Sequence, residues 1–249
     1  MKEKFDLSGL KILTFEIGTG CNLKQKHLNC PINYIQRPDG IKSLTVEDVV
    51  KAIDDAIVLH FDGYVAFHHY NEPLLYIDSI ERVVRARPRQ KYLLWSNGLL
   101  IPELERRGHS LSIFSKIVLT CYTEKDYDMM LDVQRRYPNV EVGMSDMDDR
   151  IKVYESNCEN FIACKKVFFE LPIGFNGDVL LCAHDWKNSY PLGNILRTSL
   201  MEVVASERYQ ALLSMSRKRK LAENAPEICR HCKYAFLKYH RGNKLLLDK

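Results

Sequence analysis

Residues 10–31 read LKILTFEIGTGCNLKQKHLNCP, an apolar run followed by a loop with two cysteines and a histidine. The run Leu10–Ile17 is typical of a strand, the first of the chain. In the loop, eight residues separate Cys21 from Cys30, and His27 stands three places before the second cysteine. The loop is therefore either half of a metal site with an unusual ligand or a pair of cysteines that are close only in sequence.

Length and charge narrow the classes of protein to which the chain can belong. Its 249 residues are enough for one large α/β domain, or for one domain with a small appendage. The net charge is +4, and no basic face with interleaved aromatic residues is evident, so we expect no nucleic-acid partner. No apolar run is long enough to cross a membrane, and the N-terminal MKEKFDLSG has no signal-peptide core. We therefore expect no membrane partner and a cytoplasmic location.

Strand-like apolar runs alternate with amphipathic, helix-like runs over the first two thirds of the chain. This alternation predicts an α/β fold, with a parallel sheet, crossover helices and ligands bound at the carboxyl ends of the strands. The expected strands are Lys11–Ile17, Tyr64–His69, Tyr92–Trp95, Lys116–Cys121 and Val140–Met144. The expected helices are Val46–Val58, with Thr45 as N-cap, Ile77–Arg87, Pro102–Arg107 and Asp126–Tyr137.

The pattern changes after about residue 149. Phe168–Gly174 predicts a strand, Asn176-Gly177 is a hairpin-turn dipeptide, and Asp178–Cys182 predicts the returning strand. A helical stretch, Ser199–Ser214, follows, and the chain ends in a Cys-Arg-His-Cys motif and a basic tail.

The eight cysteines are best explained by metal binding, because disulfides are rare in a reducing compartment. Cys229 and Cys232 have the spacing that lets two thiolates reach one metal centre from a tight loop. Cys164 precedes the predicted hairpin and Cys182 ends it, so the hairpin brings these ends together and all four thiolates can converge. Four sulfur ligands suit either zinc or an iron–sulfur cluster.

The loop after the first strand adds a second set of ligands. His27 and Cys30 have Cys-x-x-Cys spacing with imidazole in place of one thiolate, and imidazole ligates iron in some clusters. Cys21, His27 and Cys30 are therefore predicted to supply three ligands, which leaves one corner of a metal cluster open.

Seven motifs follow one another along the chain, namely Gly20–Pro31, His69–Leu74, Trp95–Gly98, Cys164, Cys182-x-x-Asp185, Gly193–Ile195 and Cys229-x-x-Cys232. Their order resembles the radical S-adenosylmethionine (SAM) superfamily, in the branch with a SPASM or twitch auxiliary domain. It is similar in particular to enzymes of the 2-deoxy-scyllo-inosamine dehydrogenase type, which oxidise an aminocyclitol alcohol. The resemblance implies a partial (β/α)6 TIM-like barrel over residues 1–150. It also implies a small hairpin-plus-helix twitch domain over residues 151–249.

The resemblance also implies cofactors and their ligands. These are SAM and two four-iron (4Fe–4S) clusters, one that binds SAM and one that is auxiliary. The expected ligands of the SAM-binding cluster are Cys21, His27 and Cys30, and those of the auxiliary cluster are Cys164, Cys182, Cys229 and Cys232. The expected SAM-binding residues are Asn71, Glu72, Pro73, Ser96, Asn97, Gly98 and Asp146.

The chain departs from the superfamily in the cysteine loop, where Asn29 also stands in place of the usual aromatic residue before the last cysteine, and in the turn after the second strand. The usual loop is C-x3-C-x2-C, whereas this chain has Cys21-x5-His27-x2-Cys30. Asn71 replaces the second glycine of the turn that holds the methionine amino group. Exchange of thiolate for imidazole removes a negative charge and should raise the potential of the cluster, which makes reductive cleavage of SAM harder.

The resemblance implies a radical SAM oxidoreductase that oxidises a sugar or cyclitol alcohol, with the auxiliary cluster as electron acceptor and a flavodoxin- or ferredoxin-type donor. Epimerisation is one alternative, in which a thiol such as Cys121 returns a hydrogen atom, although Cys121 is better explained as a buried structural residue. Modification of a peptide is another. An alternative of a different class is a non-catalytic iron–sulfur or zinc protein on a decayed scaffold. The sequence assigns no catalytic side chain, and His68 and His69 end the second strand, which sends one into the barrel and one outward.

Overall fold

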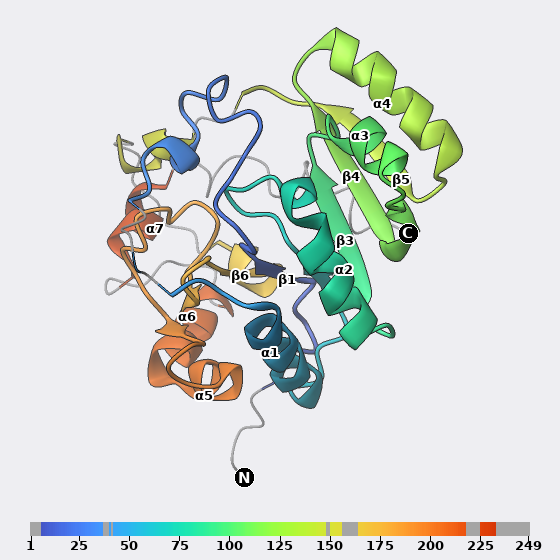
Figure 1. The fold of residues 1–249 in the computed structure, drawn as a ribbon. Helices are drawn as coiled ribbons and strands as arrows, with labels where there is room; N and C mark the ends of the chain where they lie inside the picture. The colour runs from blue at the N-terminus through green and yellow to red at the C-terminus, as the bar shows by residue number, and fades with distance from the viewer. Residues whose placement is uncertain are drawn as a thin grey trace.

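A computed structural model describes residues 6–36, 40, 42–147, 150–155, 164–217 and 225–232. Within these residues the strands form one sheet of eight, in the order β5-β4-β3-β2-β1-β6-β7-β8 (Figure 1). The strands are β1 Ile12–Phe15, β2 Tyr64–Ala66, β3 Lys91–Ser96, β4 Lys116–Cys121, β5 Val140–Met144, β6 Glu170–Ile173, β7 Asp178–Val179 and β8 Gly193–Asn194. The helices are α1 Val46–Val58, α2 Ile77–Ala86, α3 Ile101–Arg106, α4 Glu124–Arg136, α5 Leu200–Ala205, α6 Glu207–Arg217 and α7 Glu227–His231. Short 3-10 turns are η1 Pro31–Asn33, η2 Pro73–Tyr76, η3 Leu111–Ile113, η4 Arg150–Glu155 and η5 Lys166–Phe168.

Local signals account for the first helix. Thr45 forms a capping box with Asp48, because its hydroxyl accepts from the Asp48 N–H at 3.1 Å while the Asp48 carboxylate accepts from the Thr45 N–H at 3.0 Å. Two acids lie in the first turn, where the helix dipole favours negative charge. The predicted bounds of α1, Val46–Val58, are confirmed.

The predicted α/β class is confirmed, because β1 to β5 pair in parallel and α1 to α4 connect them. The sixth parallel strand, β6, comes from the C-terminal region and pairs with β1 in the register Ile12↔Glu170 to Phe15↔Ile173. The antiparallel strands β7 and β8 extend the sheet beyond β6. The two parts of the chain proposed from the sequence therefore share one hydrogen-bonded sheet.

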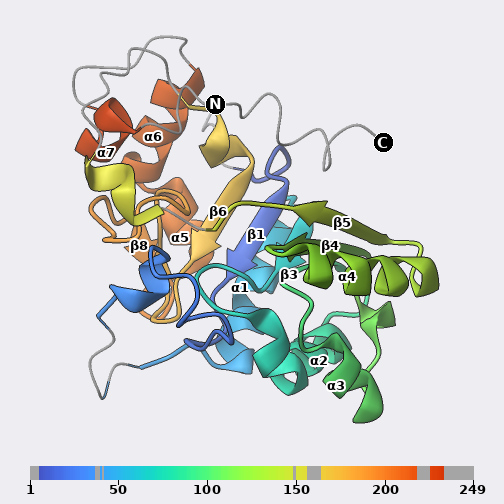
Figure 2. The same ribbon diagram turned by 90° about the horizontal axis from the view of Figure 1, so that it is seen from above.

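The two faces of the sheet have different surroundings. One face packs against α1 to α4, which lie on one side of the sheet in Figure 1 and Figure 2, and its core includes Leu13, Val65 and Leu94. The opposite face, here called the inner face, carries the small apolar cluster of Ile12, Ala66 and Leu93. Next to this cluster, the same face carries the polar side chains described below.

The C-terminal helical stretch, predicted as one helix, is divided into α5 and α6. Ser206 ends α5 in an extended conformation with ψ 145°, and its hydroxyl accepts from the Tyr209 N–H at 3.3 Å. A serine that caps the following helix in this way favours a break over a continuous helix. No helix in the described ranges is both long enough and apolar enough to span a membrane.

Candidate functional site

Three loops at the carboxyl edge of the parallel sheet are joined by hydrogen bonds. The loop after β1 is held by the loop after β2, because the Gly20 carbonyl accepts from the Glu72 N–H at 2.8 Å. The Gly20 N–H in turn donates to the Tyr76 hydroxyl at 2.6 Å. The Tyr76 ring fills the space beside Gly18, where an added Cβ would come within 2.1 Å of it. The cysteine loop is thus fixed against the turn that follows β2.

Glu72 joins this turn to the one that follows β3. Its Oε1 accepts from the Ser96 hydroxyl at 2.7 Å and from the Leu74 N–H at 3.0 Å. Its Oε2 accepts from the Asn97 side-chain amide at 2.6 Å and from the Asn97 N–H at 3.2 Å. Burial raises the pKa of Glu72, while the hydrogen bonds from these donors act in the opposite direction. Glu72 therefore connects the two turns as a buried acceptor.

Asn97 extends the network to the cysteine loop. Its amide donates to the Asn22 side-chain oxygen at 2.8 Å, next to Cys21 in the sequence. Gly98 follows with φ +75°, a left-handed conformation that favours glycine. The structure thus brings together five of the seven predicted SAM-binding residues in neighbouring turns, namely Glu72, Pro73, Ser96, Asn97 and Gly98.

The other two predicted SAM-binding residues have different surroundings. The Asn71 side chain accepts from the His69 N–H at 3.0 Å and donates to the Phe67 carbonyl at 3.0 Å, so it shapes its own loop. Asp146 is exposed in the segment after β5. Within the described residues, its carboxylate forms no hydrogen bond with the network of Glu72 and Asn97.

The two cysteines of the first loop converge. Cys30 is buried with Ile32 and Tyr70, and Cys21 packs against the same cluster. Burial raises the pKa of the Cys21 thiol, and the nearby charge of Glu72 adds to this effect. His27 is also buried, and its ring stands edge-on to Tyr122 with ring centroids 4.2 Å apart.

The four C-terminal cysteines also converge. Burial raises the pKa of the Cys229 thiol, and the neighbouring thiols Cys182, Cys232 and Cys164 raise it further. Burial likewise raises the pKa of Cys182 to about 12, against the opposing charge of Lys166. Thiols whose charges repel one another in this way are typical of ligands that a metal centre holds together as thiolates.

The spacing of these ligands bears on the kind of metal centre. In the described part of the chain, the side chains that place three ligand atoms within 4.8 Å of one another are Asp78, Glu81 and His109. They already form an ion-pair group, in which His109 Nδ1 lies 2.8 Å from Glu81. Among the described residues, neither cysteine set places three ligand atoms within 4.8 Å of one another. The thiolate and imidazole donors themselves suit iron–sulfur clusters as well as zinc.

Asp185 is a structural residue of the auxiliary region. It is fully buried after Cys182, and its carboxylate accepts from the N–H groups of Ser189 at 2.8 Å and Tyr190 at 3.0 Å and from the Tyr154 hydroxyl. Tyr154 belongs to η4, which contacts α7, and the Ile151 N–H donates to the Asn29 carbonyl at 3.4 Å. The turn η4 thus lies between the two cysteine sets.

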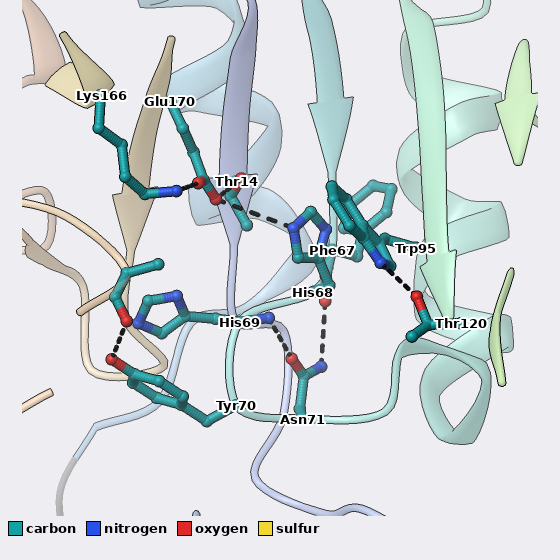
Figure 3. Close-up of polar contacts among 11 residues, drawn as sticks. Thr14, Phe67, His68, His69, Tyr70, Asn71, Trp95, Thr120, Lys166 and Glu170 are labelled. Atoms are coloured by element: carbon teal, nitrogen blue, oxygen red, sulfur yellow. Dashed lines mark hydrogen bonds and ion pairs between the residues drawn. The ribbon is translucent and has the colours of Figure 1, made fainter. Parts of the chain in front are cut away.

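The sequence did not reveal a cluster of polar side chains on the inner face (Figure 3). Glu170 accepts from the Thr14 hydroxyl at 2.9 Å and forms an ion pair with Lys166 at 3.0 Å. His68 Nε2 lies 3.8 Å from Glu170, and the His68 ring packs beside Trp95. Burial opposes ionisation of Glu170, but the charge and hydrogen bond of Lys166, together with the neighbouring His68 and His69, outweigh it and hold the pKa of this carboxyl below its usual range. The i, i+4 spacing of Lys166 and Glu170 was the available sequence signal.

Cys121, the thiol considered for an epimerase, lies on the other face of the sheet. It is 1% exposed within the core that α1 to α4 cover. This position agrees with its expected structural role and separates it from the polar inner face.

Comparison with known proteins is consistent with these features. Residues 164–233, which include the four C-terminal cysteines, match the SPASM family, an iron–sulfur cluster-binding domain. No curated protein matches the chain significantly.

Several solved structures share the fold. BtrN in complex with AdoMet and 2-DOIA is similar with a TM-score of 0.64 at 17% identity, over 90% of this chain and 93% of BtrN. The enzyme anSMEcpe with bound AdoMet is similar with a TM-score of 0.57 at 14% identity, over 84% of this chain and 81% of that one. The same enzyme with AdoMet and the Kp18Cys peptide gives a TM-score of 0.55 at 14% identity, over 84% of each chain. The chain therefore has the fold of radical SAM enzymes that carry a SPASM or twitch auxiliary domain, as its motifs predicted.

Proposed function

We propose that the chain is a radical SAM oxidoreductase that abstracts hydrogen from a small polar substrate and oxidises a sugar or cyclitol alcohol. The observation that carries this proposal is the hydrogen-bonded network of Gly20, Glu72 and Asn97, which joins the cysteine loop to the two turns beside it. A four-cysteine region that matches an iron–sulfur domain accompanies it.

The residues of the first loop fit an iron–sulfur cluster that has three protein ligands and one open coordination position. Cys21 and Cys30 pack in one cluster of side chains, and the buried His27 is the proposed third ligand. Three protein ligands leave one position for the amino and carboxylate groups of SAM. When bound, SAM and the cluster supply the one-electron chemistry that removes hydrogen from the substrate.

The chain's own residues have defined roles in this proposal. Glu72, Ser96 and Asn97 hold the turns against which the methionine part of SAM would bind. Because both Glu72 oxygens already accept from protein donors, its contribution is to fix these turns and to place negative charge near the SAM ammonium. Cys164, Cys182, Cys229 and Cys232 would hold the auxiliary cluster.

Oxidation of an alcohol to a ketone balances with two one-electron steps. The first would transfer a hydrogen atom from the carbinol carbon to the radical that bound SAM supplies. The second would transfer the remaining electron to the auxiliary cluster, while the hydroxyl proton goes to water. A flavodoxin or a ferredoxin is the proposed donor of the separate electron that cleavage of SAM requires.

Low-temperature EPR of the anaerobically reconstituted, dithionite-reduced protein tests the proposal, together with an assay for 5′-deoxyadenosine. We expect two reduced-cluster signals, of which one shifts when SAM is added. We also expect Cys21→Ala and His27→Ala to lose that signal and the formation of 5′-deoxyadenosine. Cys121→Ala is the matched control, because Cys121 lies in the core on the other side of the sheet.

Two outcomes would contradict parts of the proposal. A single signal that does not respond to SAM would indicate a non-catalytic iron–sulfur protein on this scaffold. If His27→Ala cleaves SAM as well as the wild type does, His27 is not a ligand, and the third ligand must be another residue.

Product analysis with 2-DOIA and with the Kp18Cys peptide distinguishes the substrate classes bound by the structural neighbours. A ketone formed from 2-DOIA would support the oxidation of a cyclitol. Oxidation of the peptide alone would favour peptide modification instead, and a product with inverted configuration but no net oxidation would indicate an epimerase.

A further inference from the structure

Two adjacent histidines in the loop after β2, His68 and His69, have ring nitrogens that lack hydrogen-bond partners among the described residues. Nδ1 and Nε2 of His69 and Nδ1 of His68 are buried and have no hydrogen-bond partner among the residues that the structure describes. His69 is only 6% exposed. Buried polar groups are normally hydrogen-bonded, and an unpaired one is costly, so these three nitrogens call for a ligand or for ordered water.

The surroundings of His69 hold its backbone but leave its ring nitrogens available. The His69 N–H donates to the Asn71 side chain, which also donates to the Phe67 carbonyl. Because β2 ends at Ala66, the alternation expected for a strand does not apply, and His69 is buried rather than turned to solvent. Figure 3 shows its ring directed toward Tyr70, with ring centroids 3.8 Å apart. The fixed loop therefore presents an imidazole that makes no hydrogen bond of its own.

The ring of Tyr70, which packs on His69, reaches both cysteine sets. It packs with Cys30, and its hydroxyl donates to the Ala183 carbonyl at 2.7 Å. Ala183 directly follows Cys182 in the chain. A substrate bound at His69 would thus lie near both the radical-generating site and the proposed electron acceptor.

The charges around His69 favour a neutral ligand. Burial lowers the pKa of His69 well below its usual value, and the charges of Arg150, His68 and Lys166 add to this effect while Glu170 opposes it. A neutral imidazole has one N–H donor and one acceptor nitrogen. A hydroxyl group also donates and accepts, so it can pair with either nitrogen, whereas a carboxylate or phosphate offers no donor to the acceptor nitrogen. The Glu170 carboxylate in the same cluster further disfavours an anion.

We propose that His69 is a substrate-binding residue that recognises hydroxyl groups of a small polyol held on the inner face, with His68 as its neighbour in the same site. This inference rests on the proposed function and adds to it the residue that selects the substrate. Both rings lie at the carboxyl end of β2, on the side of the sheet that carries the Glu170–Lys166 pair (Figure 3).

The test uses anaerobically reconstituted wild type, His69→Phe and His69→Gln with SAM bound. Binding of myo-inositol, a neutral polyol, is measured by titration calorimetry, with cyclohexanol as the analogue that has a single hydroxyl. Phe keeps the ring and removes both nitrogens, whereas Gln keeps one donor and one acceptor. We expect His69→Phe to weaken polyol binding by about 10-fold or more and His69→Gln to restore most of it. Cyclohexanol should bind weakly to all three proteins.

The readouts separate failure of this inference from failure of the proposed function. Formation of 5′-deoxyadenosine is measured in parallel, and its absence from the wild type would contradict the proposed function alone. Equal polyol affinity in wild type and His69→Phe would overturn the role of His69. Absence of polyol binding by a wild type that cleaves SAM would overturn the polyol class.

A second measurement covers the case in which His69→Phe does not fold. In wild type labelled with 15N-histidine, myo-inositol should shift the ring nitrogen signals of His69, which are assigned by comparison with His69→Gln. If these signals do not move at a concentration of polyol that saturates the protein, the inference is wrong.

Discussion

On the inner face, burial and neighbouring charges determine whether individual side chains are ionised. Glu170 is held ionised by Lys166, although it is buried, and the same acidic group lies 3.8 Å from a histidine that burial keeps neutral. Breaking a buried ion pair by removing one partner is costly, whereas the intact pair contributes little net stability. The Glu170–Lys166 pair is therefore weak evidence that this cluster stabilises the fold.

The stability of the protein should depend on pH through His68. Burial lowers its pKa to about 4, with Glu170 opposing and the charges of Lys166 and Arg150 adding to the shift. Between the ordinary value of about 6.5 and 4, the unfolded chain binds a proton that the folded protein does not. The free energy of unfolding should therefore fall as the pH falls through this window, by about 1 kcal/mol between pH 7.5 and 5.5 from His68 alone.

Urea denaturation of wild type and His68→Asn at the two pH values measures this contribution. The variant has no imidazole at this position, so its stability should fall by about 1 kcal/mol less than that of the wild type over the same interval. Equal losses in the two proteins would mean that His68 is protonated in the folded state or is not buried as described.

Prediction from sequence was most accurate where the signal is local. The bounds of α1, β4 and β5 follow from periodicity and capping, and all three are confirmed. Strand β2 ends earlier than predicted because the Asn71 side chain turns the backbone after Phe67.

The contact between Thr14 and Glu170 joins residues 156 apart, and no local pattern predicts such a pair. The inner-face cluster was missed for this reason, whereas the turns with Glu72 and Asn97 were found through their motifs.

At the scale of secondary-structure elements, the turn after β3 is fixed by the packing of α4. Gly98 has φ +75°, and a Cβ at this position would lie 2.2 Å from the sulfur of Met130 in α4. The turn that carries Asn97 is thus determined both by backbone conformation and by the helix that packs behind it.

Gly98→Ala should therefore cost more than an ordinary glycine substitution. Gly108 is the matched control, because it has φ +88° but has no atom within 4 Å of an added Cβ. We expect Gly108→Ala to lower the free energy of unfolding by about 1 kcal/mol, the cost of the left-handed backbone conformation. Gly98→Ala should lose a further 1–3 kcal/mol, roughly, from overpacking against Met130.

Chemical denaturation of the two variants measures this difference directly. Gly98→Ala should also weaken SAM binding in the proposed enzyme, because Asn97 and its contact with Glu72 would move with the turn. Equal destabilisation by the two substitutions would show that the Met130 side chain or α4 moves away without cost.

At the scale of the whole molecule, packed side chains and hydrogen bonds link the two cysteine sets. Tyr70 packs with Cys30 and donates to the Ala183 carbonyl, and η4 contacts both α7 and the first loop. Binding of the proposed auxiliary cluster would therefore also stabilise the loop of His69 and Tyr70, which contributes to the proposed substrate site.

Cys229→Ser tests how independent the two clusters are. We expect iron content to fall from about eight atoms per chain to about four, with loss of the signal that SAM does not affect. The signal that SAM shifts should remain, because Cys21 and Cys30 pack in a group of side chains that does not include Cys229. Iron analysis and EPR measure both effects, with Cys121→Ala as control; loss of both signals would instead indicate that the first site requires the second for its assembly.

The pairing of β6 with β1 has a consequence for how the chain folds. Strand β1 is central in the sheet only because β6, more than 150 residues later, covers its second edge. While the protein is being synthesised, β1 to β5 can assemble before β6 emerges, but one edge of β1 then remains unpaired. Exposed edge strands promote association between chains, and pairings of high sequence separation form slowly. A fragment that ends near residue 150 would keep this edge open permanently, so the two parts of the chain are expected to fold as one cooperative unit.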